Sequence, residues 1–233
     1  MNAPRHFCVI CEGKSEVSYL TRLTKFLVEE AAACGVYAPP VAFAGKPPVY
    51  GAEGGDCRTV MAAFNRERAK NRKAAFRIWV DADIHVRERM DDPEAFARHE
   101  TSILGKTEKS PPFSFSALSF EDFLAMHFDD GLYADWKAAF AAEGHFSRPL
   151  HERDYLPLFQ PFWLRRDGAD GSAYVKGDIP ENWFSAESLG NLFRHCDDHE
   201  VLAAVHALTP EPTFAEFLRR EILAAFPGLT TSH

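Results

Sequence analysis

The sequence has little that would mark a secreted, membrane-bound or generally basic protein. Its five cysteines form no disulfide framework, and it shows neither a secretory leader nor an apolar run of membrane-spanning length. Cys8 and Cys11 stand three apart in an apolar run, where they would point to opposite faces of a strand, so we interpret both as core thiols. The net charge of −8 argues against a surface that is basic throughout. We expect a cytoplasmic protein without a membrane partner.

Common catalytic motifs are missing as well. Gly13-Lys14-Ser15 matches the tail of a P-loop, but Cys8 stands where the first glycine is needed, so a P-loop nucleotidase is not expected. Neither a Gly-x-Ser-x-Gly elbow nor a dinucleotide fingerprint occurs. His195 and His199 have the i, i+4 spacing of a zinc-binding helix, but no Glu follows the first His. Surface or capping histidines are the simpler interpretation of that pair.

What is present is an alternation of strands and helices. Apolar runs predict strands at 7–11, 41–44, 76–80 and 113–118, with helices between them: one capped by Ser15, one ending near residue 72, and one from Asp83 to about residue 104. This order predicts an α/β fold with a mostly parallel sheet flanked by helices over residues 1–130. Residues 131–233 predict a mainly helical C-terminal elaboration packed on that core, with a looser aromatic stretch at 155–163 and helices near 133–142, 185–196, 200–208 and 214–226.

Carboxylates follow two of the predicted strands. Glu12 ends the first, and Asp81 and Asp83 follow the third. In open α/β sheets ligands bind at the carboxyl ends of the strands, so these side chains would meet if the strands are neighbours. If the strand continues through Asp83, the two aspartates project to the same face. Three carboxylates suit Mg²⁺ or Mn²⁺ and phosphodiester chemistry, with Glu12 as metal ligand or proton shuttle. The alternative is a simple turn or helix cap at Asp81 to Asp83.

A basic run covers residues 66–73, at the end of the second predicted helix, with Glu67 as its one acid. If that end faces the crevice at the carboxyl ends of the strands, it could meet phosphates. The alternative is a solvated outer face of the helix, which is what most charge runs on amphipathic helices are.

Four phrases, in order, carry a resemblance to a known family. They are Cys11-Glu12-Gly13 leading through Ser15-Glu16 to Tyr19-Leu20, the strand ending in Asp81-Ala82-Asp83, the run from Ser119-Phe120-Glu121 to His127-Phe128, and Tyr174-Val175-Lys176. Together they resemble the RloB-like family, and the resemblance spans most of the chain. Ser15 stands where the family has Thr, Ala117-Leu118 where it has Asn-Pro, and Phe123 where it has Trp.

The resemblance implies a Toprim-like fold and a role in bacterial antiphage defence. It makes Glu12 the Toprim glutamate, Asp81 and Asp83 its D-x-D pair, and Glu121 a further catalytic or metal carboxylate. Lys176 matches the family's Tyr-x-Lys phrase, and we expect it or Lys14 to neutralise charge on the scissile phosphate. His127 matches a family position without an assigned role, and for Glu121 and His127 a polar position at a helix margin remains the alternative.

Our prediction is a Mg²⁺-dependent nuclease of the Toprim type that acts on DNA or RNA. The rival is a non-catalytic module that senses nucleic acid or a nucleotide and serves a defence-system partner protein, a reading that the net charge of −8 favours. A third reading, primase-like nucleotidyl transfer, uses the same metal logic. The aromatic-rich second half leaves a homodimer open.

Overall fold

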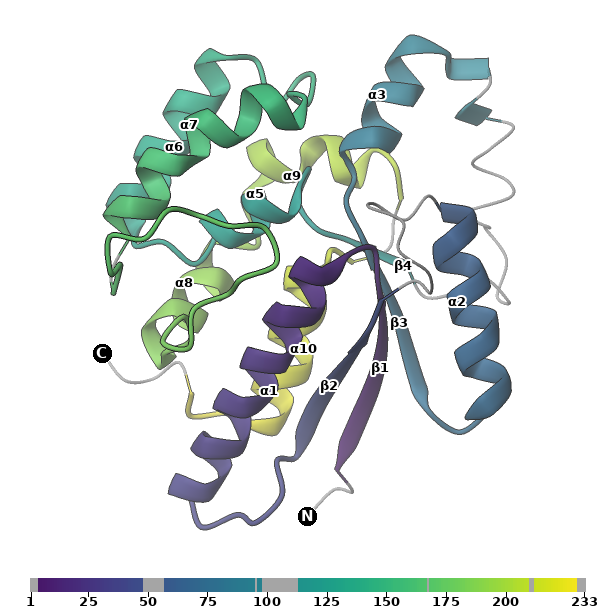
Figure 1. The fold of residues 1–233 in the computed structure, drawn as a ribbon, viewed down its shortest axis with the longest axis vertical. Helices are drawn as coiled ribbons and strands as arrows, with labels where there is room; N and C mark the ends of the chain where they lie inside the picture. Colours follow the sequence, from purple (N-terminus) through teal and green to yellow (C-terminus); the bar gives the residue numbers. More distant parts are fainter. Residues whose placement is uncertain are drawn as a thin grey trace.

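The computed structural model describes residues 4–47, 57–94, 96–97, 113–166, 168–209 and 212–229. Four strands form one sheet in the order β2-β1-β3-β4, and every neighbouring pair is parallel. The strands are β1 (Arg5–Cys11), β2 (Val41–Lys46), β3 (Ala75–Val80) and β4 (Phe113–Phe115). The predicted α/β class with a parallel sheet flanked by helices is therefore confirmed, an arrangement consistent with a Toprim-like fold (Figure 1).

Both faces of the sheet are covered, which is why its strands read as continuous apolar runs. On β1, Val9 and Cys11 point into a core shared with α1 (Lys14–Ala33), whereas Ile10 points into a second core with α2 (Cys57–Lys70). The two strand cysteines thus face opposite sides, as expected. Cys11 is buried, and Cys8 is half-buried rather than a full core thiol.

Several predicted ends shift by a few residues. The first helix begins at Lys14 with Gly13 as its N-cap, so Ser15 is not the cap. The second strand runs on to Lys46, into the segment predicted as a loop, and the rest of that loop, residues 48–56, lies outside the described residues. The helix α3 (Asp83–Asp91) is shorter than the predicted one, whose last part, residues 98–104, also lies outside them. The last strand stops at Phe115.

The C-terminal part is helical, as predicted. It contains α5 (Phe120–Ala125), α6 (Asp130–Ala142), α7 (Glu152–Arg165), α8 (Ala186–His195), α9 (His199–His206) and α10 (Phe214–Ala225). The aromatic stretch predicted as loose is α7, a helix despite Pro157 and Pro161. Its residues Tyr155, Phe159 and Trp163 recur every fourth position and are all buried, so packing of this stripe outweighs the cost of the prolines.

The C-terminal helix α10 returns to the sheet. The Phe214 ring stacks on Trp79 of β3, with centroids 3.9 Å apart and planes at 9°. Phe217 meets Phe7 of β1 edge to face, with centroids 5.1 Å apart. Residues after 131 therefore complete the core that covers one face of the sheet, rather than form a body of their own.

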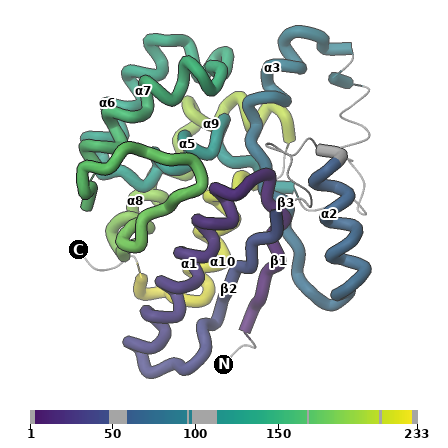
Figure 2. The backbone as a smooth tube through the Cα atoms, in the orientation of Figure 1, coloured from purple at the N-terminus to yellow at the C-terminus, as the bar shows by residue number. Residues whose placement is uncertain are grey.

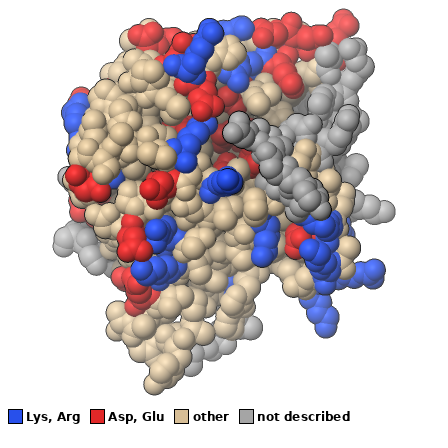
Figure 3. Space-filling view, in the orientation of Figure 1, with Lys and Arg blue, Asp and Glu red and all other residues tan. Residues whose placement is uncertain are grey.

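The basic end of α2 lies away from the carboxyl ends of the strands. The helix α2 connects the carboxyl end of β2 to the amino end of β3. Its last turn, with Arg68 and Lys70, therefore lies near the amino ends of the strands, at the opposite end of the sheet from the crevice (Figure 2). Basic side chains gather there, over the lower end of α2 in Figure 3. The idea that this end faces the crevice is wrong, because the crossover carries it to the amino end of β3.

No helix among the described residues is both long and apolar enough to cross a membrane.

Candidate metal centre

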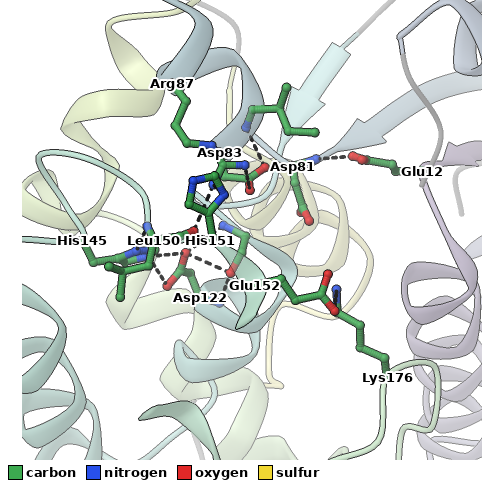
Figure 4. A network of polar contacts seen from close by, with 12 residues as sticks. Glu12, Asp81, Asp83, Arg87, Asp122, His145, Leu150, His151, Glu152 and Lys176 are labelled. Atoms are coloured by element: carbon green, nitrogen blue, oxygen red, sulfur yellow. Dashed lines mark hydrogen bonds and ion pairs between the residues drawn. The ribbon is translucent and has the colours of Figure 1, made fainter. Parts of the chain in front are cut away.

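Two carboxylates meet where β1 and β3 end. The strands are parallel neighbours in which Cys11 pairs with Trp79, and the Glu12 N–H donates to the Trp79 carbonyl over 3.2 Å. The backbone N–H of Asp81 in turn donates to Glu12 Oε2 over 2.8 Å. The predicted adjacency of these two strand ends is thus confirmed, and the two acidic residues are joined directly by a hydrogen bond (Figure 4).

A third carboxylate comes from the first turn of α1. Glu16 is 4% exposed, and its Oε2 accepts the Gly13 N–H over 3.1 Å. One carboxylate oxygen each from Glu12, Glu16 and Asp81 lie within 4.8 Å of one another. These three residues, called the acidic triad below, are the group that can hold a cation. The sequence names Glu16 only as part of the phrase that resembles the family, although its position four residues after Glu12, in the first turn of the helix, is the available signal.

Asp81 carries the clearest sign that a ligand belongs here. Its Oδ1 is buried and has no hydrogen-bond partner among the described residues. An unpartnered buried carboxylate oxygen is costly, because burial removes water without a replacement donor. A divalent cation supplies that missing partner, and carboxylate oxygens are its preferred protein ligands. The residues present therefore fit a hard metal such as Mg²⁺ or Mn²⁺.

Asp83 does not join the acidic triad. The strand stops at Val80, and Asp83 is the first residue of α3 rather than a continuation of β3. Its Oδ1 accepts the Ile84 N–H over 2.6 Å, and its Oδ2 pairs with Arg87 Nη2 over 2.9 Å. Figure 4 shows its side chain directed at Arg87. The premise that the strand continues through both aspartates is wrong, because the chain turns into a helix after Asp81.

Glu121 and Lys176 lie at the margin of the centre. Glu121 is 4% exposed, and its Oε1 accepts the Tyr174 hydroxyl over 3.0 Å. Its charge raises the pKa of Glu16 and Asp81, which places it beside the acidic triad. Lys176 is half-exposed and its Nζ lies 3.1 Å from Glu152 Oε1. Lys14, the other candidate cation, is exposed at the start of α1.

The pKa values of all three carboxyl groups of the acidic triad are raised. Burial raises the pKa of Glu12 to about 8 and that of Glu16 to about 7, and the neighbouring carboxylates add to both shifts. Burial, together with the charges of Glu12 and Glu16, raises the pKa of Asp81 well above its usual value. The positive charge of Lys176 lowers the pKa of Glu12 and Glu16 only in part. Three ionised carboxylates at this spacing need a cation between them.

His127 lies outside the centre. Its Nδ1 donates to the Ser188 carbonyl over 3.1 Å, so its Nε2 is the acceptor for the Tyr19 hydroxyl at 2.9 Å. Burial lowers the pKa of His127 to about 3, which keeps the ring neutral. His127 therefore ties α1 to α8 inside the core. His127 and Glu121 stand in the same sequence phrase because both belong to the segment around α5, and they do not share a site.

The histidine pair considered for zinc is split between two helices. His195 is in α8 and His199 begins α9. The His195 ring stacks on Tyr133 with centroids 3.9 Å apart, and its Nδ1 donates to the Met126 carbonyl over 3.0 Å. His195 thus packs against Tyr133 and caps the C-terminal end of α5 at Met126, which agrees with the interpretation as a capping histidine.

Comparison of the chain with protein-family models, with curated proteins and with solved structures gives no match.

Proposed function

We propose that this chain is a divalent-metal-dependent nuclease of the Toprim type, which hydrolyses phosphodiester bonds in DNA or RNA with Mg²⁺ or Mn²⁺. The observation that carries the proposal is the acidic triad with the buried, unpartnered Asp81 Oδ1. The acidic triad lies at the carboxyl ends of the parallel strands, which is where α/β folds bind their ligands. The resemblance to the RloB-like family supports the same activity, and with it we propose a role in antiphage defence in the cytoplasm, with a defence-system protein as a further partner.

The roles follow from the contacts. Glu12, Glu16 and Asp81 would hold the metal, which when bound supplies an activated water and stabilises charge on the phosphate. Glu12, whose pKa is raised to about 8 by burial, can hold or release a proton near neutral pH. The hydrogen bond from the Asp81 N–H fixes the Glu12 carboxylate in place.

Lys176 is a cation at the margin of the acidic triad. Its charge acts on Glu12, Glu16 and Glu121, and its Nζ is held by Glu152. Held at this point, Lys176 would neutralise negative charge that develops on the scissile phosphate. Asp83 has a positioning role in this scheme, because its ion pair with Arg87 anchors the start of α3, next to Asp81.

The test is cleavage of plasmid, linear and single-stranded DNA and of RNA with Mg²⁺ or Mn²⁺ by three proteins. We expect the parent and Asp91→Asn to cleave alike, because Asp91 is an exposed aspartate on α3 that pairs with Arg148 on the surface. Asp81→Asn should cleave at least about 100-fold more slowly. Mutating a residue that only hydrogen-bonds to a metal ligand already costs up to about 100-fold in activity, and removing the ligand itself should cost no less. Equal cleavage by the parent and Asp81→Asn contradicts the proposal.

A non-catalytic sensor is the second candidate, and one observation favours it. The net charge is −8, and the basic end of α2 lies near the amino ends of the strands, away from the acidic triad. A free-standing nuclease gains affinity from basic groups around its site. If the folded parent binds metal and polynucleotide but cleaves nothing in the panel, this second function replaces the first.

A further inference from the structure

A cavity of about 210 Å³ opens between the end of α7 and the start of α8. Its walls include Phe128, Arg166, Trp183, Glu187 and Ser188. None of its lining residues belongs to the acidic triad. The volume is several times the ~30 Å³ that one water occupies in the liquid, so it has room for a small ligand.

Arg166 is a buried cation that no described carboxylate pairs with directly, although Asp170 lies close enough to act on its charge. It is 7% exposed, and no carboxylate among the described residues lies within ion-pair distance of it. Its Nη1 donates to the Trp163 carbonyl over 2.6 Å, and its guanidinium carbon lies 3.7 Å from the centroid of that Trp ring. Its Nε and Nη2 make no hydrogen bond within the described part of the chain, and burial lowers its pKa while the charge of Asp170 partly opposes that shift. A charge buried in this way is stabilised when an anion pairs with it.

The N-terminus of α8 opens onto the same cavity. Ser185 caps the helix and its hydroxyl accepts the Ser188 N–H over 3.0 Å. The N–H groups of Ala186 and Glu187, in the first turn, have no acceptor among the residues described. Trp183 forms an adjoining wall, and its Nε1 is likewise buried without a partner in the described chain. Donors at a helix N-terminus and a guanidinium together favour an oxyanion.

We propose that this cavity binds a small ligand through a phosphate group, which pairs with the Arg166 guanidinium and accepts hydrogen bonds from the first turn of α8. Phe128 and Trp183 offer an apolar wall to the rest of the ligand. Two acids in the lining limit the charge of that ligand. Asp129 is engaged in capping α6, where its Oδ1 accepts the N–H groups of Gly131 and Leu132, whereas Glu187 stands exposed. A single phosphate therefore fits better than a polyphosphate.

The first experiment is calorimetric titration of inorganic phosphate into the full chain, with a chelator present so that metal does not bring phosphate to the acidic triad. The parent should show saturable binding, and Arg166→Gln should weaken it at least tenfold. Arg165→Gln is the matched control, because Arg165 is exposed and pairs with Asp135 on the surface. It should bind phosphate like the parent. Absence of saturable binding to the parent, or equal binding by Arg166→Gln, overturns the proposal.

A second variant covers the case in which Arg166→Gln does not fold. Glu187 is exposed, so Glu187→Gln should fold and, by removing a negative charge from the cavity, tighten phosphate binding about threefold. Unchanged or weaker binding by this variant counts against the proposal. Asp81→Asn should bind phosphate like the parent, which separates this site from the metal centre. A further titration with a 5′-mononucleotide and with the uncharged nucleoside tests whether the phosphate is what the cavity recognises.

Discussion

Two aspartates with buried carboxylate oxygens, Asp81 and Asp122, differ in how those oxygens are satisfied. Asp122 is 0% exposed, and its carboxylate accepts hydrogen bonds from the Ser119 N–H at 2.7 Å, the Tyr155 hydroxyl at 2.7 Å and His145 Nε2 at 3.0 Å. Asp81 has a buried Oδ1 with no donor in the described structure and two further carboxylates within 4.8 Å. The first is satisfied by the protein, and the second lacks a partner.

The Asp122 network is also closed at its far end. The Leu150 N–H donates to His145 Nδ1 over 3.1 Å, so the proton of the neutral ring is on Nε2 and points at Asp122 (Figure 4). Every member of this network has its partner inside the protein. The difference teaches that burial of a carboxylate does not mark a site by itself; a buried oxygen without a donor does.

The largest effect on stability should come from breaking the closed network. Asp122→Asn places an amide N–H₂ against donors from Ser119, Tyr155 or His145, so we expect a loss of about 3 kcal/mol in the free energy of unfolding. Urea unfolding measures it. Asp81→Asn, as the matched variant, should be as stable as the parent without metal or more so, because it removes repulsion within the acidic triad. Equal destabilisation by both variants would erase the contrast.

The next effect is metal-dependent stability. A cation that binds only the folded acidic triad should raise the free energy of unfolding by about 2.7 kcal/mol when it is present at 100 times its dissociation constant. Asp81→Asn should lose this gain. Asp122→Asn should show the same gain, starting from its lower free energy of unfolding without metal. Thermal unfolding with and without Mg²⁺ or Mn²⁺ gives the comparison. A gain retained in Asp81→Asn would place the metal elsewhere.

The pH dependence of the metal-free protein follows from the raised carboxyl pKa values. Because burial lifts the pKa of Glu12 to about 8 and of Glu16 to about 7, the folded state binds more protons than the unfolded state between about pH 4.5 and pH 8. Stability should therefore fall as the pH rises through that window, by several kcal/mol, because each unit of pKa shift is worth about 1.4 kcal/mol. Urea unfolding in chelator at several pH values measures it. A Glu12→Gln, Glu16→Gln double variant should make this fall shallower, with the remainder due to Asp81, Asp83 and Glu121. A rising profile in the parent would contradict the assignment.

Glu121 is an intermediate case and should give the smallest effect. It is buried with the Tyr174 hydroxyl as a donor, so Tyr174→Phe removes one hydrogen bond to a charged group. We expect a loss of about 1 to 2 kcal/mol and a raised pKa of Glu121. Urea unfolding tests the first, and carbon NMR of the carboxyl group tests the second. An unchanged free energy of unfolding would show that Glu121 has another donor in solution.

The sheet could be predicted because its physics is local. Continuous apolar runs of strand length, separated by helical periodicity, leave a parallel α/β sheet as the consistent answer. The meeting of Glu12 and Asp81 follows from that, since both residues end neighbouring parallel strands. The apolar run alone does not show that the chain turns into a helix after Asp81, which is why the sequence groups Asp83 with Asp81 although Asp83 begins α3.

Other parts depend on contacts that no local pattern carries. Glu16 could be read as a first-turn acid, but its burial depends on how α1 packs on the sheet. The helix over 152–165 contains two prolines, and only the core that receives its aromatic stripe makes it stable. The basic run of α2 is visible in the sequence. The distance of that run from the acidic triad depends on whether α2 ends near the amino or the carboxyl ends of the strands.

The return of α10 to the sheet has a consequence for the order of folding. Phe214 and Phe217 cover Trp79 and Phe7, residues that precede them by more than half of the chain. Contacts between such distant residues must wait for a large loop to close, which slows folding. Until α10 docks, Trp79 has its neighbours Tyr19 and Phe123 but lacks the ring that stacks on it. The sheet therefore reaches its final cover only when the last of the described helices is in place.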